Sequence, residues 1–216
     1  MGDSIPIGSA FDFGWEKMKG NLRFFLISYI VAGLCFLPAG LFLVLTAVFA
    51  AKSDWVLTAI FAVLMVIAYI VPYVGIFIGY LKAGIRICSG EELHVKDCLP
   101  TVEEWFKVFI ANCIYFTMVG VGLLLCVLPG IWLAVKFWSY GWFIVAEGSG
   151  PIEAFKEAEE LTSDLTFDFL VFFVLCGVVL AIGWIALLIG LAFAFPVVLI
   201  ATTYVFAKSA GIAAPG

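Results

Sequence analysis

Hydrophobic residues gather along this chain in long runs that charged residues rarely interrupt. A helix needs about 20 apolar residues to cross a hydrocarbon core of about 30 Å. Six runs are near that size, at residues 22–51, 55–81, 108–128, 131–146, 169–190 and 191–207. The pattern predicts an all-α, polytopic membrane protein with about six transmembrane helices, forming a single integral membrane domain over residues 1–216.

Some runs predict departures from straight spanning helices. Pro38 and Pro72 lie inside the first two runs and could kink them. The fourth run, 131–146, is short for a full crossing, so it could be strongly offset in the bilayer or partly re-entrant. The last two runs are nearly continuous, and a break is predicted near Gly190.

Two polar segments have the 3.6-residue period of an amphipathic helix. One face of segment 7–18 carries Ile7, Ala10, Phe11, Gly14, Trp15 and Met18. One face of segment 151–164 carries Ile152, Phe155, Ala158 and Leu161. The other face of that segment carries Glu153, Lys156, Glu157, Glu160 and Asp164. Each segment is predicted either to lie in the membrane plane as an interfacial helix or to pack on the protein itself.

Two helix starts are marked in the sequence. Pro151 follows Gly150 and suits the first helical position, where its missing N–H leaves no bond unmade. Thr101 and Glu104 have the spacing of a capping box, which predicts the start of the third spanning helix.

The chain also shows signs of internal repetition. When it is shifted by 91 residues, Asn21, Phe25, Leu34, Cys35, Leu37 and Pro38 match Asn112, Phe116, Leu125, Cys126, Leu128 and Pro129. A fainter third copy begins near Ala154. We predict three units, each an amphipathic inner segment followed by a helical hairpin, although chance matches among apolar residues would give a similar pattern.

Composition and charge agree with a membrane protein and argue against one class of partner. The chain is 65% hydrophobic and 12% charged, against about 45–50% and about 25% in soluble domains. Its formal net charge of −5 argues against nucleic acid, which binds a basic face. Seven of the sixteen acidic residues lie between Glu147 and Asp168, so the imbalance belongs to one segment.

The basic residues predict the orientation, because cytoplasmic loops carry an excess of Lys and Arg. With the N-terminus inside, the inner side holds Lys17, Lys19, Arg23, Lys82, Arg86, Lys96, Lys107, Lys156 and Lys208. Only Lys52 then lies outside. Both termini are therefore predicted to be cytoplasmic.

The sequence has few groups of residues typical of catalytic, metal-binding or cofactor-binding sites, so no catalytic site, metal or cofactor is predicted. Cys88, His94 and Cys98 share one loop, but a zinc site would want a fourth ligand and shorter spacing. Ordinary reduced thiols are the simpler interpretation, and the cysteines show no disulfide framework.

Lys136 and Glu147 are the candidate ligand-binding residues. Lys136 lies inside an apolar run, where a charge is costly and often functional. By the predicted topology it lies near the outer end of its run, so it could instead reach the headgroups there. Glu147 ends the same run and is either a lipid-headgroup or helix-packing residue or a solvated loop acid. On one helix the two would share a face but stand about 16 Å apart, too far to pair.

Several motifs resemble a known family. They are PGIWLAVK at 129–136, IVAEG at 144–148, GPIEAFK at 150–156 and ELT at 160–162. Together they resemble the membrane domain that precedes the catalytic barrel in some bacterial glycerophosphodiester phosphodiesterases. Phe11, Trp15, Asn21 and Phe25 resemble the start of the same domain. The likeness covers nearly the whole chain.

The resemblance implies a bacterial inner-membrane protein like the stand-alone relatives of that domain, whose function is unknown. No soluble stretch here could hold the catalytic barrel, so phosphodiesterase activity is not implied. The chain departs from the family at 157–160, EAEE, where an Arg or Ser would be expected. That puts in doubt any role shared with more basic relatives.

Two functions remain open. The first is a non-catalytic scaffold or accessory subunit, whose acidic inner segment could dock a basic protein partner. The second is a transporter or lipid-handling protein, favoured by the apparent repeats, the prolines within spans and Lys136. An intramembrane enzyme would need paired acids or a nucleophile at depth, which the runs do not offer. Membrane lipids are expected partners in either case, and a homo-oligomer is an alternative to a different protein partner.

Overall fold

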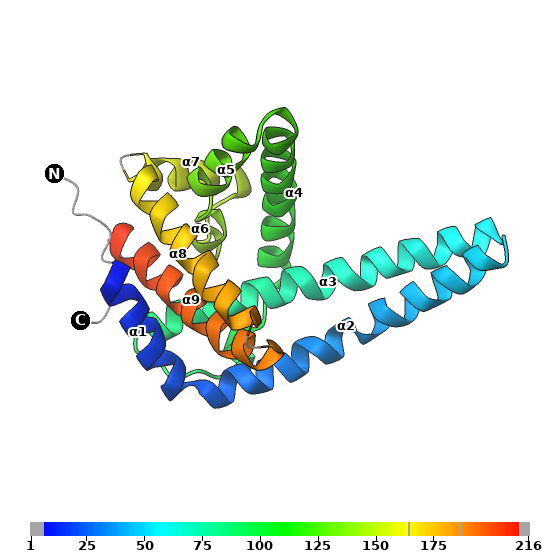
Figure 1. Cartoon of the computed structure of the whole chain (residues 1–216), viewed down its shortest axis with the longest axis horizontal. Coiled ribbons are helices and arrows are strands. Elements are labelled where there is room, and N and C mark those ends of the chain that lie inside the picture. The colour runs from blue at the N-terminus through cyan, green and yellow to red at the C-terminus, as the bar shows by residue number, and fades with distance from the viewer. Residues whose placement is uncertain (1–6, 164, 186, 212–216) are drawn as a thin grey trace.

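The computed structural model describes residues 7–163, 165–185 and 187–211, and in this part of the chain the regular elements are all helical (Figure 1). The elements are α1 (Ile7–Gly20), α2 (Leu22–Ala51), α3 (Trp55–Cys88), η1 (Val95–Cys98), α4 (Val102–Leu125), α5 (Val127–Lys136), α6 (Tyr140–Ala146), α7 (Pro151–Thr162), α8 (Thr166–Ile185) and α9 (Leu187–Ser209). The prediction of an all-α, polytopic membrane protein is confirmed. Among the described residues, α2, α3, α4, α8 and part of α9 are long and apolar enough to cross a membrane.

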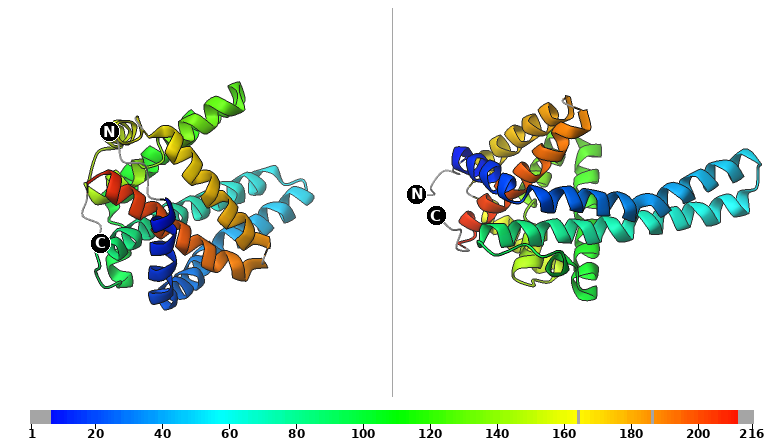
Figure 2. Two further views of the ribbon diagram at one scale, coloured as in Figure 1. Left: turned by 60° about the vertical axis from the view of Figure 1, so that its left-hand side comes forward. Right: turned by 90° about the horizontal axis from the view of Figure 1, so that it is seen from below.

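The α2–α3 hairpin is the longest feature of the molecule, and its far half extends away from the other helices (Figures 1 and 2). Asp54 starts α3 by accepting a hydrogen bond from the Leu57 N–H at 3.1 Å. Pro38 and Pro72 lie inside helices that continue through them. The apolar side chains of the projecting half are largely exposed, as expected of a surface that faces lipid rather than water.

The fourth apolar run, which was predicted to be offset or partly re-entrant, does not form one helix. Its residues divide between α5, which ends at Lys136, and α6, which begins at Tyr140. Side chains from other helices stabilise the break. They donate hydrogen bonds to carbonyl groups that would bond to backbone N–H groups in a continuous helix. The Tyr115 hydroxyl donates to the Ala134 carbonyl at 3.1 Å, and the Thr162 hydroxyl donates to the Lys136 carbonyl at 2.7 Å.

The remaining helix boundaries agree with the local signals in part. Thr101 and Glu104 form the expected capping box, and α7 begins at Pro151 as predicted. The break between the last two runs falls earlier than expected, because α8 ends at Ile185 and α9 begins at Leu187. Gly183 lies so close to α9 that a Cβ atom there would stand 2.7 Å from the Cβ of Ala194.

Both amphipathic segments pack on the protein itself. Helix α1 lies along α9 and buries Ala10, Gly14 and Met18. Helix α7 lies against α6, α4 and α5 and buries Ala154, Phe155, Ala158 and Thr162. Asp164, expected on the polar face of this segment, lies outside the described residues. Trp15 of α1 and Ile152 of α7 remain exposed, by 49% and 68%, so each helix still presents apolar surface outward.

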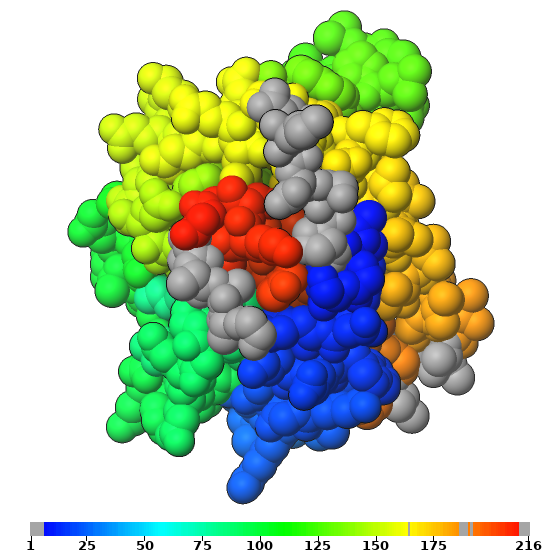
Figure 3. Space-filling view, turned by 90° about the vertical axis from the view of Figure 1, so that its left-hand side faces the viewer, coloured from blue at the N-terminus to red at the C-terminus, as the bar shows by residue number. Residues whose placement is uncertain are grey.

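The buried core lies where α3, α4 and α6–α9 meet, at the end of the molecule opposite the hairpin tip. Aromatic rings dominate it, and Trp138 alone has ring contacts with Trp142, Phe169, Phe173 and Phe206. Figure 3 shows that α1, the end of α9 and the segment that follows α3 share this end of the molecule.

Among the described residues, three pairs of sequential helices form hairpins, namely α2–α3, α4–α5 and α8–α9, with α6 and α7 between the second and the third. They differ in length, and α4 is steeply inclined to the α2–α3 hairpin (Figure 1). Residues matched by the 91-residue shift also occupy different settings. Pro38 lies inside α2, whereas Pro129 lies in the first turn of α5. A common evolutionary unit behind the three hairpins therefore stays a prediction.

Candidate functional site

Lys136 is the last residue of α5, and its charge is satisfied within the protein. Its ammonium group lies 2.7 Å from the Glu159 carboxylate of α7 and 4.6 Å from the centre of the Trp132 ring. The predicted topology placed α7 inside and Lys136 near the outer membrane surface, and residues in direct contact cannot be so separated. Lys136 and α7 therefore lie on the same side, and the predicted topology cannot hold for both of them.

Glu147, the second predicted residue, follows the end of α6 and is exposed. Its backbone N–H donates to the Phe143 carbonyl, so its backbone terminates the helix. The break after α5 places Glu147 and Lys136 on different helices. No hydrogen bond or ion pair joins these two side chains in the described structure. The structure therefore does not assemble them into one site.

The loop after α3 buries its cysteines and exposes its histidine. Cys88 and Cys98 are 2% and 7% exposed, whereas His94 points outward near Glu92. Within the described residues, no group of three or more His, Cys, Asp or Glu side chains is arranged to hold a metal ion. Burial raises the pKa of the Cys98 thiol, although the nearby Arg86 opposes this. At neutral pH the thiol is therefore protonated and a poor nucleophile.

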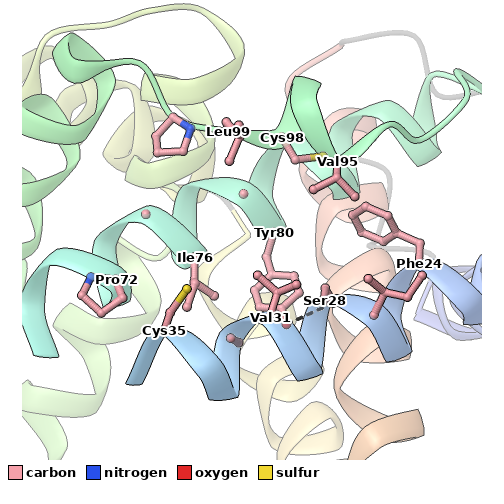
Figure 4. A pocket seen from close by; sticks show the side chains of 15 residues that line it. Phe24, Ser28, Val31, Cys35, Pro72, Ile76, Tyr80, Val95, Cys98 and Leu99 are labelled. Atoms are coloured by element: carbon pink, nitrogen blue, oxygen red, sulfur yellow. Dashed lines mark hydrogen bonds between the residues drawn. The ribbon is translucent and has the colours of Figure 1, made fainter. Parts of the chain in front are cut away.

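An apolar groove runs between α2, α3 and the η1 segment, and the sequence alone gave no sign of it (Figure 4). Its volume is about 250 Å³. Its walls are almost entirely apolar and are formed by Phe24, Ile27, Ser28, Val31, Ala32, Cys35, Pro72, Gly75, Ile76, Gly79, Tyr80, Val95, Cys98, Leu99 and Pro100. Small-molecule pockets usually measure about 300–1,000 Å³ and are mostly apolar, so this groove is slim but of a similar kind.

Helical spacing explains how α2 and α3 form the walls. On α2, Phe24, Ser28, Val31 and Cys35 recur every three or four residues and so lie along one face. The distance from Phe24 to Cys35 along the helix is about 16 Å, at 1.5 Å per residue. Figure 4 shows Phe24 and Val95 at one end of the groove and Cys35 and Pro72 at the other. The groove is therefore long and narrow, parallel to the hairpin.

Two glycines of α3 let the η1 segment approach the hairpin. A Cβ atom at Gly79 would stand 3.2 Å from the Cys98 carbonyl oxygen, and one at Gly75 would stand 3.7 Å from Cγ of Pro100. The GxxxG spacing of Gly75 and Gly79 therefore serves packing within the monomer.

Ion pairs hold the roof of the groove in place. The Lys82 ammonium donates to the Glu104 carboxylate at 2.8 Å and to the Leu99 carbonyl at 3.1 Å. Arg86 lies 3.3 Å from Glu91 and 3.2 Å from Asp97. These contacts tie the segment between α3 and α4 to the last turns of α3, so the roof has a defined position.

The polar atoms inside the groove satisfy one another. The Ser28 hydroxyl donates to the Phe25 carbonyl at 2.7 Å, which leaves its oxygen free to accept from the Tyr80 hydroxyl at 3.4 Å. A hydroxyl pair bonded in this way demands no polar ligand. The groove is thus suited to an apolar chain rather than to a polar solute.

A second, more open apolar groove lies on the other side of the same hairpin. It has a volume of about 860 Å³ and shares Ala32, Ile76 and Tyr80 with the first. Its outer walls come from α8 and α9, through Leu180, Ala192 and Phe195. The base of the α2–α3 hairpin is therefore flanked by apolar grooves on two sides.

Comparisons of the chain with protein-family models, with curated proteins and with solved structures found no match. The resemblance to the membrane domain of glycerophosphodiester phosphodiesterases therefore remains a prediction. Evidence about function has to come from the groove and from the charges around it.

Proposed function

We propose that this protein is a non-catalytic, multi-pass membrane protein that binds a membrane lipid, holding an acyl chain in the groove between α2, α3 and η1. The observation that carries the proposal is the shape and lining of the groove, which is about 16 Å long along the helix and almost wholly apolar. We further propose that both termini lie inside, based on the distribution of Lys and Arg. The resemblance noted in the sequence supports the bacterial cytoplasmic membrane as the location.

The membrane environment constrains how such a groove can work. Lipid tails are already in an apolar solvent, so moving one into the groove gains little hydrophobic free energy. The lipid must then be retained by close packing of its chain against a surface with a defined shape, and by contacts between the protein and its polar headgroup. The tethered η1 roof supports the first of these, because it holds the groove in one shape.

The experiment tests whether filling the groove abolishes lipid retention. The full-length protein would be purified in a neutral detergent, and bound phospholipid would be measured by native mass spectrometry. Gly75→Leu places a side chain in the groove, and we expect it to reduce retained lipid at least several-fold. Gly33→Leu is the matched control, because a Cβ atom at Gly33 has no neighbour within 4 Å. Equal retention in both variants would refute binding in this groove.

A scaffold or accessory subunit is the second candidate, and one observation supports it. Helix α7 carries exposed acids that a basic protein partner could bind. Internal contacts occupy two of its acids, since Glu153 accepts from the Gly150 N–H at 3.1 Å and Glu159 pairs with Lys136. Purification from native membranes with identification of co-purifying proteins tests this alternative, which predicts a stoichiometric protein partner.

A further inference from the structure

The corner between α1 and α2 carries three basic side chains at the base of the hairpin. Lys17 and Lys19 lie in the last turn of α1, and Arg23 lies in the first turn of α2. Met18, Phe25 and Ile87 are buried together here, so the corner is packed against the last turn of α3. The three cations therefore occupy a fixed position at one end of the hairpin.

These cations differ from Lys82 and Arg86, which carboxylates neutralise. The ion pairs found in the described residues include none for Lys17, Lys19 or Arg23. Lys96 of η1, next to the groove-lining Val95, resembles these three cations, because it too has no ion pair among the described residues. Lys19 instead lies 4.8 Å from the centre of the Trp15 ring, and Lys17 lies 5.4 Å from that of Phe13.

Helical geometry connects this corner to the groove. Arg23 precedes Phe24, which lines the groove, and lies one turn before Ile27 and two turns before Val31. One turn of helix is about 5.4 Å, so the backbone of Arg23 lies within about one turn of the groove's end. The acids of α1, Asp12 and Glu16, precede the lysines and so lie further from α2 along the helix.

Toward the opposite end of the groove, the α2 and α3 walls carry no charge, and Lys82 and Glu104 beside Leu99 neutralise each other. Between Arg23 and Lys52 on α2, and between Trp55 and Lys82 on α3, the sequence has no Lys, Arg, Asp or Glu. An amphiphile in the groove must then place its polar end at the α1–α2 corner and its chain toward Cys35 and Pro72. Trp15, which is 49% exposed beside Lys19, is a residue type enriched at membrane interfaces.

We infer that the α1–α2 corner binds the phosphate of an anionic phospholipid whose acyl chain occupies the groove, so that Lys17, Lys19 and Arg23 select the headgroup. This inference rests on the proposed lipid binding and adds its specificity. Because the groove itself gains little over the bilayer for an apolar chain, the charged corner is the part of the site that distinguishes one lipid from another.

The test compares two phospholipids with identical chains, phosphatidylglycerol and phosphatidylcholine, added to the delipidated full-length protein in neutral detergent. Binding would be measured by native mass spectrometry at low and high salt. We expect phosphatidylglycerol to bind more tightly, by about fivefold for each cation that contacts it. Added salt should narrow the difference, because it screens exposed charges.

Arg23→Gln should weaken phosphatidylglycerol binding about fivefold and leave phosphatidylcholine binding unchanged. Lys52→Gln is the matched control, because Lys52 lies at the far end of the hairpin and should have no effect on either lipid. Equal weakening by Lys52→Gln would overturn the inference, since it would show a response to net charge alone. Inorganic phosphate at millimolar concentration should not displace the lipid, and displacement would mean that the corner binds free phosphate.

The experiment separates failure of this inference from failure of the proposed function. If both lipids bind equally and Gly75→Leu abolishes both, the groove holds a chain but the corner does not select the headgroup. If Gly75→Leu leaves both lipids bound as in the unaltered protein, the proposed function itself is wrong.

Discussion

At the scale of single residues, the structure explains how a lysine is kept within an apolar run. Lys136 contacts Glu159 through an ion pair and the Trp132 ring through a cation–π interaction. Its side chain is only 18% exposed, whereas that of Glu159 is 50% exposed, so water screens the pair on one side. The pair therefore fastens α5 to α7 with moderate strength.

A double-mutant cycle would measure that strength. Lys136→Ala, Glu159→Ala and the combined variant should give a coupling free energy of about 1 kcal/mol, from reversible unfolding in mixed detergent micelles. The pair of Lys107 and Glu103 is the control, because it lies within one helix with Glu103 77% exposed. We expect about 0.3–0.5 kcal/mol there. A coupling for Lys136 no larger than the control would contradict a role in fastening α7.

At the scale of elements, close approach at glycines decides how neighbouring helices pack. Helices α4 and α5 fold back on each other at Cys126, and a Cβ atom at Gly130 would stand 2.7 Å from the backbone N of Leu123. Helices α1 and α9 meet in the same way, since a Cβ atom at Gly14 would stand 2.6 Å from the Val197 carbonyl oxygen. No flexible side chain can move aside at these backbone contacts, so the helices themselves would have to separate.

Gly130→Ala should therefore destabilise the protein by about 1–3 kcal/mol, because the added methyl group forces α5 away from α4. Gly120→Ala is the matched control in α4, since nothing lies within 4 Å of a Cβ atom there. It should be neutral or stabilise the protein by up to about 1 kcal/mol through higher helix propensity. Thermal unfolding in detergent distinguishes the two, and equal behaviour would argue against tight α4–α5 packing.

At the scale of the whole molecule, the charges are segregated along the α2–α3 hairpin. Its base carries Lys17, Lys19, Arg23, Lys82 and Arg86, and its tip carries Lys52. The tip and the base lie at opposite ends of the molecule's longest axis (Figure 1). An excess of Lys and Arg marks the cytoplasmic side, so the tip should lie outside.

Cysteine labelling tests this orientation in the protein with its native cysteines replaced. Ser53→Cys, at the tip, should react with a membrane-impermeant maleimide in intact cells. Ser89→Cys, an exposed position after α3, should react only after the membrane is permeabilised. The reverse pattern would invert the topology, and labelling of both in intact cells would show that the hairpin does not cross the bilayer.

Local signals in the sequence were sufficient to predict a helix boundary where contacts within that one helix determine it. The capping box at Thr101 and the start of α7 at Pro151 were predicted correctly, because each depends on contacts within one helical turn. For residues 131–146 the sequence predicted an offset or partly re-entrant run but not the position of the break. The break depends on hydroxyl groups of Tyr115 and Thr162, which lie far away in the sequence and bond to the freed carbonyls of α5.

The sequence by itself determined that the chain is helical and belongs in a membrane, because runs of about 20 apolar residues have no other stable solution in lipid. It also determined which segments are amphipathic and where the basic residues concentrate. Only the tertiary structure decided that Lys136 pairs with Glu159 and that α1 and α7 pack on the protein. It alone formed the groove, because the groove needs α2, α3 and a tethered loop to meet, and the spacing of residues along one helix does not specify its neighbours.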